Sequence, residues 1–277
     1  MLNEAARKVA PVLLFLASTA TALADARLKV NYEGSVTAIP VGRGEFVLDI
    51  ADGGYAVVGS ARVAGIAKLV SRGHGTVSAK GTFIDGYPSP SAYMTNSESE
   101  KKKEDIRISF ANAAVSSFSV VPPTEPSKDR IPLTENDRTG VVDPMTAAIV
   151  SVPGTGDLLS PDNCKRTIPI FDGRQRYDLV FSYERTDNAK DIKGYNGKLL
   201  VCRVDYRPIA GHKPDRLQVK YMQDNKNIFV WLAPVAGTRV LFPARVSIVT
   251  LIGIVVVQAE HFEVSPREAS IKNTDTK

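Results

Sequence analysis

The sequence predicts a mainly β protein: a single curved antiparallel sheet, bent into a half-open barrel, with two or three short helices. Apolar and polar side chains alternate with a period of two in many segments, as in strands with one buried face. Turn-forming pairs such as Asp52-Gly53 and Asn196-Gly197 separate several of these segments. The chain has 277 residues, of which 43% are hydrophobic, and this is enough to fill one good core. We therefore expect one β-rich domain over residues 25–265.

Ten to twelve strands are expected, each recognised by its alternation or by β-branched residues. The segments are 27–36, 45–50, 55–59, 81–87, 90–96, 106–110, 116–121, 177–184, 198–206, 217–222, 227–232 and 245–258. Short helices are expected over 62–71, from helical spacing, and over 145–150. The second of these follows Asp143-Pro144, because Asp is a preferred N-cap and Pro is tolerated in the first turn.

Other local features qualify this layout. Pro88 and Pro90 remove hydrogen-bond donors, so the segments around them are expected to be edge or bulged strands. Residues 245–258 contain the most hydrophobic run after the N-terminus and predict one central buried strand with a bend at Gly253. The polar, proline-bearing stretch 122–137 predicts a loop, and residues 266–277 predict a disordered polar tail.

The only two cysteines, Cys164 and Cys202, bracket the segment around which we expect the chain to be organised. We interpret it as a hairpin clipped by a Cys164–Cys202 disulfide, which would close a loop of about 39 residues and contribute about 3.5–4 kcal/mol. The alternative is two buried free thiols. A zinc site is disfavoured because no histidine lies near the two cysteines.

Residues 1–24 predict a cleavable export signal, which favours the disulfide. Arg7 and Lys8 form a positive region, Val9 to Ala17 an apolar core, and Ala22-Leu23-Ala24 an A-x-A cleavage pattern. We expect cleavage after Ala24 and a periplasmic location, with no transmembrane segment in the mature chain, because a spanning helix needs about 20 apolar residues. The alternative is an N-terminal helix that tethers the protein to a membrane.

Charge and motifs argue against several function classes. The formal net charge is +5, but both signs are interspersed, so no nucleic-acid partner is expected. No H-E-x-x-H, G-x-S-x-G or G-x-x-x-x-G-K motif is present, and an S-x-x-K match at residues 99–102 lies in a charged loop without a K-T-G partner. His74, His212 and His261 are too scattered to suggest a metal site. We therefore predict no catalytic residue, no metal and no cofactor.

Three carboxylates are candidates for a hydrolytic site. Asp172, Asp178 and Glu184 could in principle pair, but Asp172-Gly173 is more simply a turn. Asp178 and Glu184 are expected on the solvent face of their strand. A hydrolase therefore remains the least favoured hypothesis.

Binding of a hydrophobic molecule is more plausible, because the concave face of a half-barrel must be filled by side chains, a helix or a ligand. The alternative is a closed core that fills itself. The predicted lining consists of large apolar residues from several strands: Phe46, Leu48, Phe110, Leu179, Phe181, Val230 and Leu232.

Three local patterns together resemble a family of proteobacterial envelope proteins, domain of unknown function 3108. They are residues 28–34 (LKVNYEG), Val142-Asp143-Pro144-Met145, and residues 168–174 (IPIFDGR) leading to Tyr177. The resemblance covers residues 28–258 and implies a signal peptide and a curved sheet like that of lipoprotein carriers. It supplies no activity, and it implies structural roles for the residues that match: Asp143, Pro144, Phe171, Asp172, Gly173 and Tyr177.

The leading hypothesis is thus a soluble, non-enzymatic periplasmic protein of a Gram-negative bacterium that binds a lipid or another hydrophobic ligand in its concave sheet. The alternatives are an interaction module that docks an envelope protein through a sheet edge, and a hydrolase of envelope material. The sequence leaves the ligand, the partner and the oligomeric state open.

Overall fold

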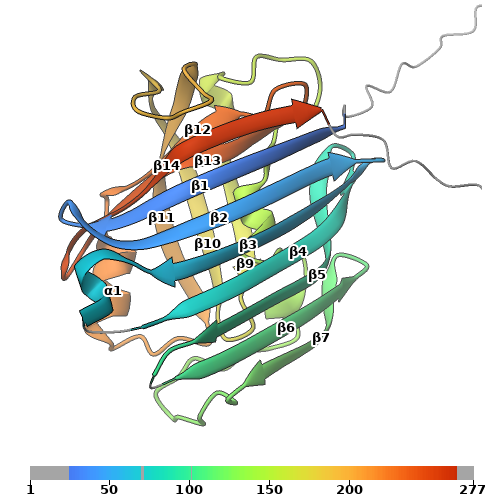
Figure 1. The fold of residues 1–277 in the computed structure, drawn as a ribbon. Helices are drawn as coiled ribbons and strands as arrows, with labels where there is room; N and C mark the ends of the chain where they lie inside the picture. The colour runs from blue at the N-terminus through green and yellow to red at the C-terminus, as the bar shows by residue number, and fades with distance from the viewer. Residues whose placement is uncertain (1–24, 70–71, 101, 267–277) are drawn as a thin grey trace, which may run out of the picture.

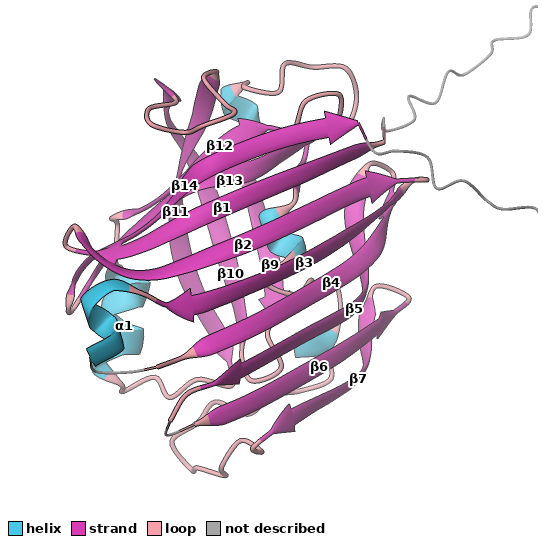
Figure 2. Cartoon of the chain, in the orientation of Figure 1, coloured by secondary structure: helices cyan, strands magenta, loops and turns pink. Residues whose placement is uncertain are grey.

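The computed structural model describes residues 25–69, 72–100 and 102–266. The predicted export signal and the tail after Pro266 lie outside these ranges. Within them the chain forms a 14-stranded antiparallel sheet that curls over on itself without closing into a barrel (Figures 1 and 2). This confirms the predicted fold class, with more strands than expected.

The sheet runs in the order β7-β6-β5-β4-β3-β2-β1-β14-β13-β12-β11-β10-β9, and the short β8 pairs with β13. The bounds of the strands are β1 (Ala26–Val36), β2 (Ile39–Ala51), β3 (Gly54–Val63), β4 (His74–Ile84), β5 (Tyr87–Glu98), β6 (Lys103–Ala111), β7 (Ala114–Val121), β8 (Val150–Ser151), β9 (Arg166–Phe171), β10 (Arg176–Asn188), β11 (Lys198–Ala210), β12 (Ile228–Pro234), β13 (Val240–Thr250) and β14 (Gly253–Pro266).

Helical structure is sparse in the described part of the chain. It consists of one α-helix, α1 (Leu217–Asp224), and of 3-10 turns η1 (Gly65–Leu69), η2 (Asn136–Arg138), η3 (Thr146–Ala148) and η4 (Pro161–Cys164). The helix predicted over 145–150 is therefore a single 3-10 turn. The helix predicted over 62–71 is likewise too long, because β3 continues to Val63 before η1 begins.

The structure corrects two of the predicted strands. Residues 217–222 form α1 instead of a strand, because Leu, Gln, Lys and Met are good helix formers and the segment has no neighbouring strand to pair with. Residues 245–258 are a hairpin and not one bent strand, since the chain reverses at residues 251–252 between β13 and β14.

Pro88 and Pro90 lie in β5, a strand inside the sheet, but the part of β5 that contains them is paired on one side only. Both residues pair with β4. The pairing of β5 with β6 begins only at Ala92, so the proline-bearing part of β5 has one unpaired side.

The sheet has two ends that differ in content. At the α1 end lie α1, η1 and the two neighbouring turns Thr37–Ala38 and Leu251–Ile252 (Figure 1). The turns are tied by a hydrogen bond from the Thr37 N–H to the Ile254 carbonyl oxygen, 2.8 Å. At the opposite end lie the turns Asp52–Gly53, Asp85–Gly86 and Asn112–Ala113, the first of which was predicted.

Most of the interior is filled by side chains. One ladder of directly paired residues crosses six strands on the inner face: Leu28, Leu48, Val57, Ala79, Tyr93 and Ile108. All six are buried. They belong to core clusters that also take in Phe171 of β9 and Phe242 of β13.

Strands β11–β13 are buried on both faces. Val201, Trp231 and Phe242 belong to the cluster shared with β1–β3. Their chain neighbours Leu200, Leu232 and Leu241 belong to a separate cluster, and alternation along a strand places these on the opposite face. That second face is covered by the segment 150–164, which includes Val150, Val152, Leu158 and Cys164.

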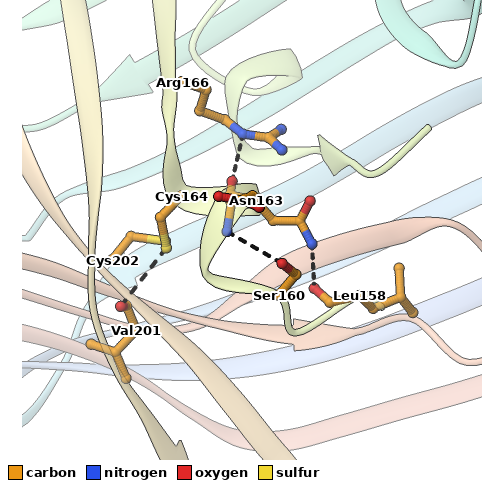
Figure 3. Close-up of a disulfide and its surroundings, with 8 residues drawn as sticks. Leu158, Ser160, Asn163, Cys164, Arg166, Val201 and Cys202 are labelled. Atoms are coloured by element: carbon orange, nitrogen blue, oxygen red, sulfur yellow. Dashed lines mark hydrogen bonds between the residues drawn. A yellow bond between two sulfur atoms is a disulfide. The ribbon is translucent and has the colours of Figure 1, made fainter. Parts of the chain in front are cut away.

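The disulfide joins this covering segment to the sheet. Cys164 and Cys202 are bonded, with their Cα atoms 5.6 Å apart, and both are fully buried (Figure 3). The expectation that the bridge would clip a hairpin of neighbouring strands is wrong. Cys164 ends the 3-10 turn η4, Cys202 lies in β11, and β10 separates β9 from β11.

Short hydrogen bonds order the turn that carries Cys164. The Asn163 side-chain amide donates to the carbonyl oxygens of Asp157 and Leu158, each at 2.9 Å. The Arg166 Nε donates to the Asn163 carbonyl oxygen at 2.7 Å (Figure 3). The disulfide therefore attaches a hydrogen-bonded covering segment, residues 150–164, to the face of the sheet that carries Leu200, Leu232 and Leu241.

Candidate functional site

The predicted lining residues do not surround one concave cavity. Leu48 packs in the cluster of β1–β3, and Phe110 packs beside β9. The other residues from β10–β12 pack in the cluster under the 150–164 segment: Leu179, Phe181, Val230 and Leu232. Only Phe46 of the predicted set borders the cavity described next. Alternation in the sequence identified positions that pack in a core. It cannot tell which of two buried faces a side chain lies on, and β11–β13 are buried on both faces.

An apolar cavity of about 600 Å³ lies at the α1 end, on the inner face of β1–β5. Its wall is made of small residues that are paired directly across neighbouring strands. One row is Tyr32, Gly44, Ala61, Gly75 and Ser97, and the next is Val257, Gly34, Gly42 and Val63. Because glycine and alanine leave the inner face nearly bare, the space that larger side chains fill elsewhere stays open here.

The floor of the cavity is aromatic. Tyr32 and Phe46 meet edge to face with ring centroids 5.6 Å apart. The Phe46 ring covers Gly59, where an added Cβ would lie only 2.3 Å from a ring carbon. Gly59 is therefore needed for Phe46 to lie flat, and the ring separates the cavity from the packed core.

Tyr32 also links β1 to β13, which is separated from it by β14 alone. Its hydroxyl donates a 2.5 Å hydrogen bond to the carbonyl oxygen of Pro243 in β13. Burial raises the pKa of Tyr32, so the phenol stays neutral. The floor of the cavity thus presents aromatic surface with its polar atom already satisfied.

Most charged residues that border this cavity belong to the outer face of the sheet. One row of directly paired residues lies between the two rows of small residues, so alternation places its side chains on the outer face: Arg43, Arg62, His74 and Glu98. Glu104 lies on the inner face, where it pairs with Ser97. The charge of Glu104 is already paired, because its carboxylate lies 2.7 Å from the Arg174 guanidinium. The inner face of the cavity therefore offers contacts mainly for an apolar molecule.

The carboxylates considered for hydrolysis do not converge. Asp172 accepts hydrogen bonds from the backbone N–H groups of Arg174 and Gln175, at 2.8 and 2.7 Å, as a turn residue does. Asp178 pairs with Arg176 at 2.7 Å. Within the described ranges, no group of His, Cys, Asp and Glu is arranged to hold a metal ion.

The family-motif residues gather where the two ends of the curled sheet approach each other. Phe171 of β9 is fully buried against residues of β6 and meets Phe118 of β7 edge to face, with ring centroids 5.3 Å apart. Gly173 has φ +94°, and an added Cβ would lie 2.7 Å from Ile106. These residues pack the β9 edge of the sheet against β6 and β7 at the other edge.

A short backbone segment completes that closure. The Gly140 N–H donates to Ala113 O at 2.7 Å, beside β7. Two residues later, Val142 exchanges hydrogen bonds with β9: its N–H donates to Pro169 O at 2.9 Å, and its carbonyl oxygen accepts from Phe171 N–H at 3.0 Å. Residues 139–142 therefore bridge the two edge strands of the sheet, β7 and β9.

Asp143 follows this bridge and is completely buried. One carboxylate oxygen accepts from the backbone N–H groups of Met145 and Thr146, each at 2.9 Å, and the other accepts from the Thr146 hydroxyl at 2.5 Å. The Thr146 hydroxyl is also 2.9 Å from that of Tyr55. The predicted capping role is thus present, but the link to Tyr55 was missed because it joins residues far apart in sequence.

The fold and the cavity together define the class of this protein: a single curled antiparallel sheet that is packed at one end and hollow and apolar at the other. The sequence model of the family described as "Protein of unknown function (DUF3108)" matches residues 29–260, and the chain belongs to this family. No curated protein and no solved structure shows significant similarity to the chain.

Proposed function

We propose that the protein is an exported, non-enzymatic component of the bacterial envelope that binds a lipid or another hydrophobic ligand in the cavity of β1–β5. The observation that carries the proposal is the apolar cavity of about 600 Å³ with its aromatic floor. Its volume lies within the range of small-molecule sites, and its lining of apolar walls with few polar groups is typical of them.

Export is proposed on separate grounds. Residues 1–24 have the order of a secretory signal: positive residues, an apolar core and an A-x-A site. The buried Cys164–Cys202 disulfide fits an oxidising compartment such as the periplasm. In the described part of the chain, no helix is long and apolar enough to cross a membrane.

The test is to purify the protein from the periplasm of a Gram-negative host and to analyse it by native mass spectrometry and lipid extraction. Binding of cis-parinaric acid, a fluorescent fatty acid, gives a quantitative readout. The key variant is Gly34→Leu. A Cβ at Gly34 meets only Gly42 O, at 3.8 Å, so the new side chain enters the cavity without a backbone clash.

We expect the wild-type protein to carry lipid or to bind the probe, and Gly34→Leu to weaken binding at least tenfold while the protein stays folded. The control is Ser35→Leu, which adds the same side chain on the other face of β1. A wild-type protein that is empty and does not bind the probe would contradict the proposal. So would equal binding by Gly34→Leu and wild type.

A further inference from the structure

Exposed aliphatic side chains gather at two adjacent turns of the α1 end. Ile39 follows the β1–β2 turn and is 47% exposed, and Ile252 in the β13–β14 turn is 78% exposed. Leu251 and Ile254 are each 46% exposed. The Thr37–Ile254 hydrogen bond of 2.8 Å holds the two turns side by side, so these residues form one patch, which we call the tip patch.

A basic groove borders the tip patch. It lies beside Pro40 and is lined by Arg43, Arg62 and Lys68, with Glu33 as the acidic member. Glu33 is 3.4 Å from Arg43, so one of the three positive charges is offset. Exposed aliphatic residues next to excess positive charge match a bilayer interface that contains anionic phospholipids, where apolar groups enter the acyl region and cations meet phosphate.

The tip patch is continuous with the cavity. Val41 and Gly42 line the cavity and lie two and three residues beyond Ile39 on β2. Val257 lines it from β14, three residues beyond Ile254. Towards the opposite end the interior is packed with buried side chains such as Leu28 and Val57. A hydrophobic ligand would therefore enter or leave at the α1 end.

We propose that the tip patch inserts into the surface of an anionic lipid bilayer and so places the mouth of the cavity on the membrane. The apolar turns supply the insertion, and the basic groove supplies attraction to phosphate head groups. This inference rests on the proposed function, since it gives the route by which a lipid reaches the cavity. The two can nevertheless be tested separately.

The experiment is flotation of the mature protein with vesicles of phosphatidylethanolamine and phosphatidylglycerol, compared with vesicles of phosphatidylethanolamine and phosphatidylcholine. The variant is Leu251→Asn with Ile252→Asn, at exposed turn positions where substitution costs little stability. The matched control is Ile84→Asn, because Ile84 is 59% exposed beside a turn at the opposite end.

We expect wild type and Ile84→Asn to float with the phosphatidylglycerol vesicles. The double variant should bind them at least tenfold more weakly, because burial of one aliphatic side chain alone strengthens insertion by about that factor. Arg62→Gln and added salt should each weaken binding to phosphatidylglycerol vesicles.

Equal vesicle binding by the double variant and wild type would overturn the inference, and so would the absence of binding by wild type. A wild-type dimer in size-exclusion chromatography that the double variant dissociates would assign the tip patch to self-association instead. Parinaric acid binding separates the two proposals. The double variant should retain it in vesicle-free buffer, whereas Gly34→Leu should lose it and still bind vesicles.

Discussion

Asp143 is a buried carboxylate whose oxygens are all occupied by contacts within the fold. Its carboxylate is completely buried and satisfies two backbone N–H groups and one hydroxyl. Burial is the largest influence on its pKa and raises it, although the hydrogen bonds from Thr146 and Met145 oppose the shift. The sequence indicated a cap at this position, and the structure adds the Tyr55 contact that anchors the cap to β3.

The raised pKa of Asp143 predicts a specific pH dependence. In the unfolded chain an Asp titrates near pH 3.9. Between that pH and the higher pKa in the folded state, the folded protein holds a proton that the unfolded chain has released, so the free energy of unfolding falls as pH rises. Asp143→Asn removes this titrating group.

Urea unfolding of wild type and Asp143→Asn should be compared at a series of pH values. The stability of the wild type relative to the variant should decline as pH rises from about 4 through the raised pKa. A difference between the two proteins that stays constant across this range would show that Asp143 is not responsible.

At the scale of elements, the disulfide attaches a covering segment to the sheet and does not staple two strands together. The segment 150–164 shields Leu200, Cys202 and Leu232, which would otherwise leave one face of β11 and β12 in water. The sequence predicted the cysteine pair from their number and the export signal. It could not show that Cys202 of β11 is bonded to a cysteine in a turn that packs over β10 and β11.

Cys202→Ser should therefore lower the free energy of unfolding by about 3–4 kcal/mol under oxidising conditions, from the chain-entropy model for a separation of 38 residues. Hydrogen exchange should speed up most at residues 157–164. The control is the same comparison with reductant, where wild type also lacks the bond and the two proteins should nearly coincide. An equal loss with reductant present would contradict the disulfide's role.

At the scale of the whole molecule, the curled sheet is held by contacts between its two ends. Arg174, in the β9–β10 turn, lies 2.7 Å from Glu104 of β6. It also donates to Thr124 Oγ1 and Pro122 O, each at 2.9 Å. These contacts add to the backbone bridge made by residues 139–142.

Arg174→Ala should loosen this closure without unfolding the sheet. We expect a loss of about 1–2 kcal/mol, because the lost hydrogen bonds are charge-assisted but the ion pair is partly exposed. Exchange of the Gly140, Val142 and Phe171 amide protons should become faster. The control is Arg107→Ala, whose ion pair with Asp105 joins two residues of the same strand. If both variants exchange alike, Arg174 does not hold the ends together.

The sequence by itself determined many of the strands, because alternation reports which side chains of one segment share a face, as in β1, where Ala26, Leu28 and Val30 are buried. It also indicated the cysteine pair and the Asp143 cap. Only the tertiary structure decided where the cavity lies. That hollow exists because Gly34, Gly42, Gly44 and Gly75 come from three strands and meet on one inner face. Pairing between strands brings such residues together, and no periodicity within one strand encodes it.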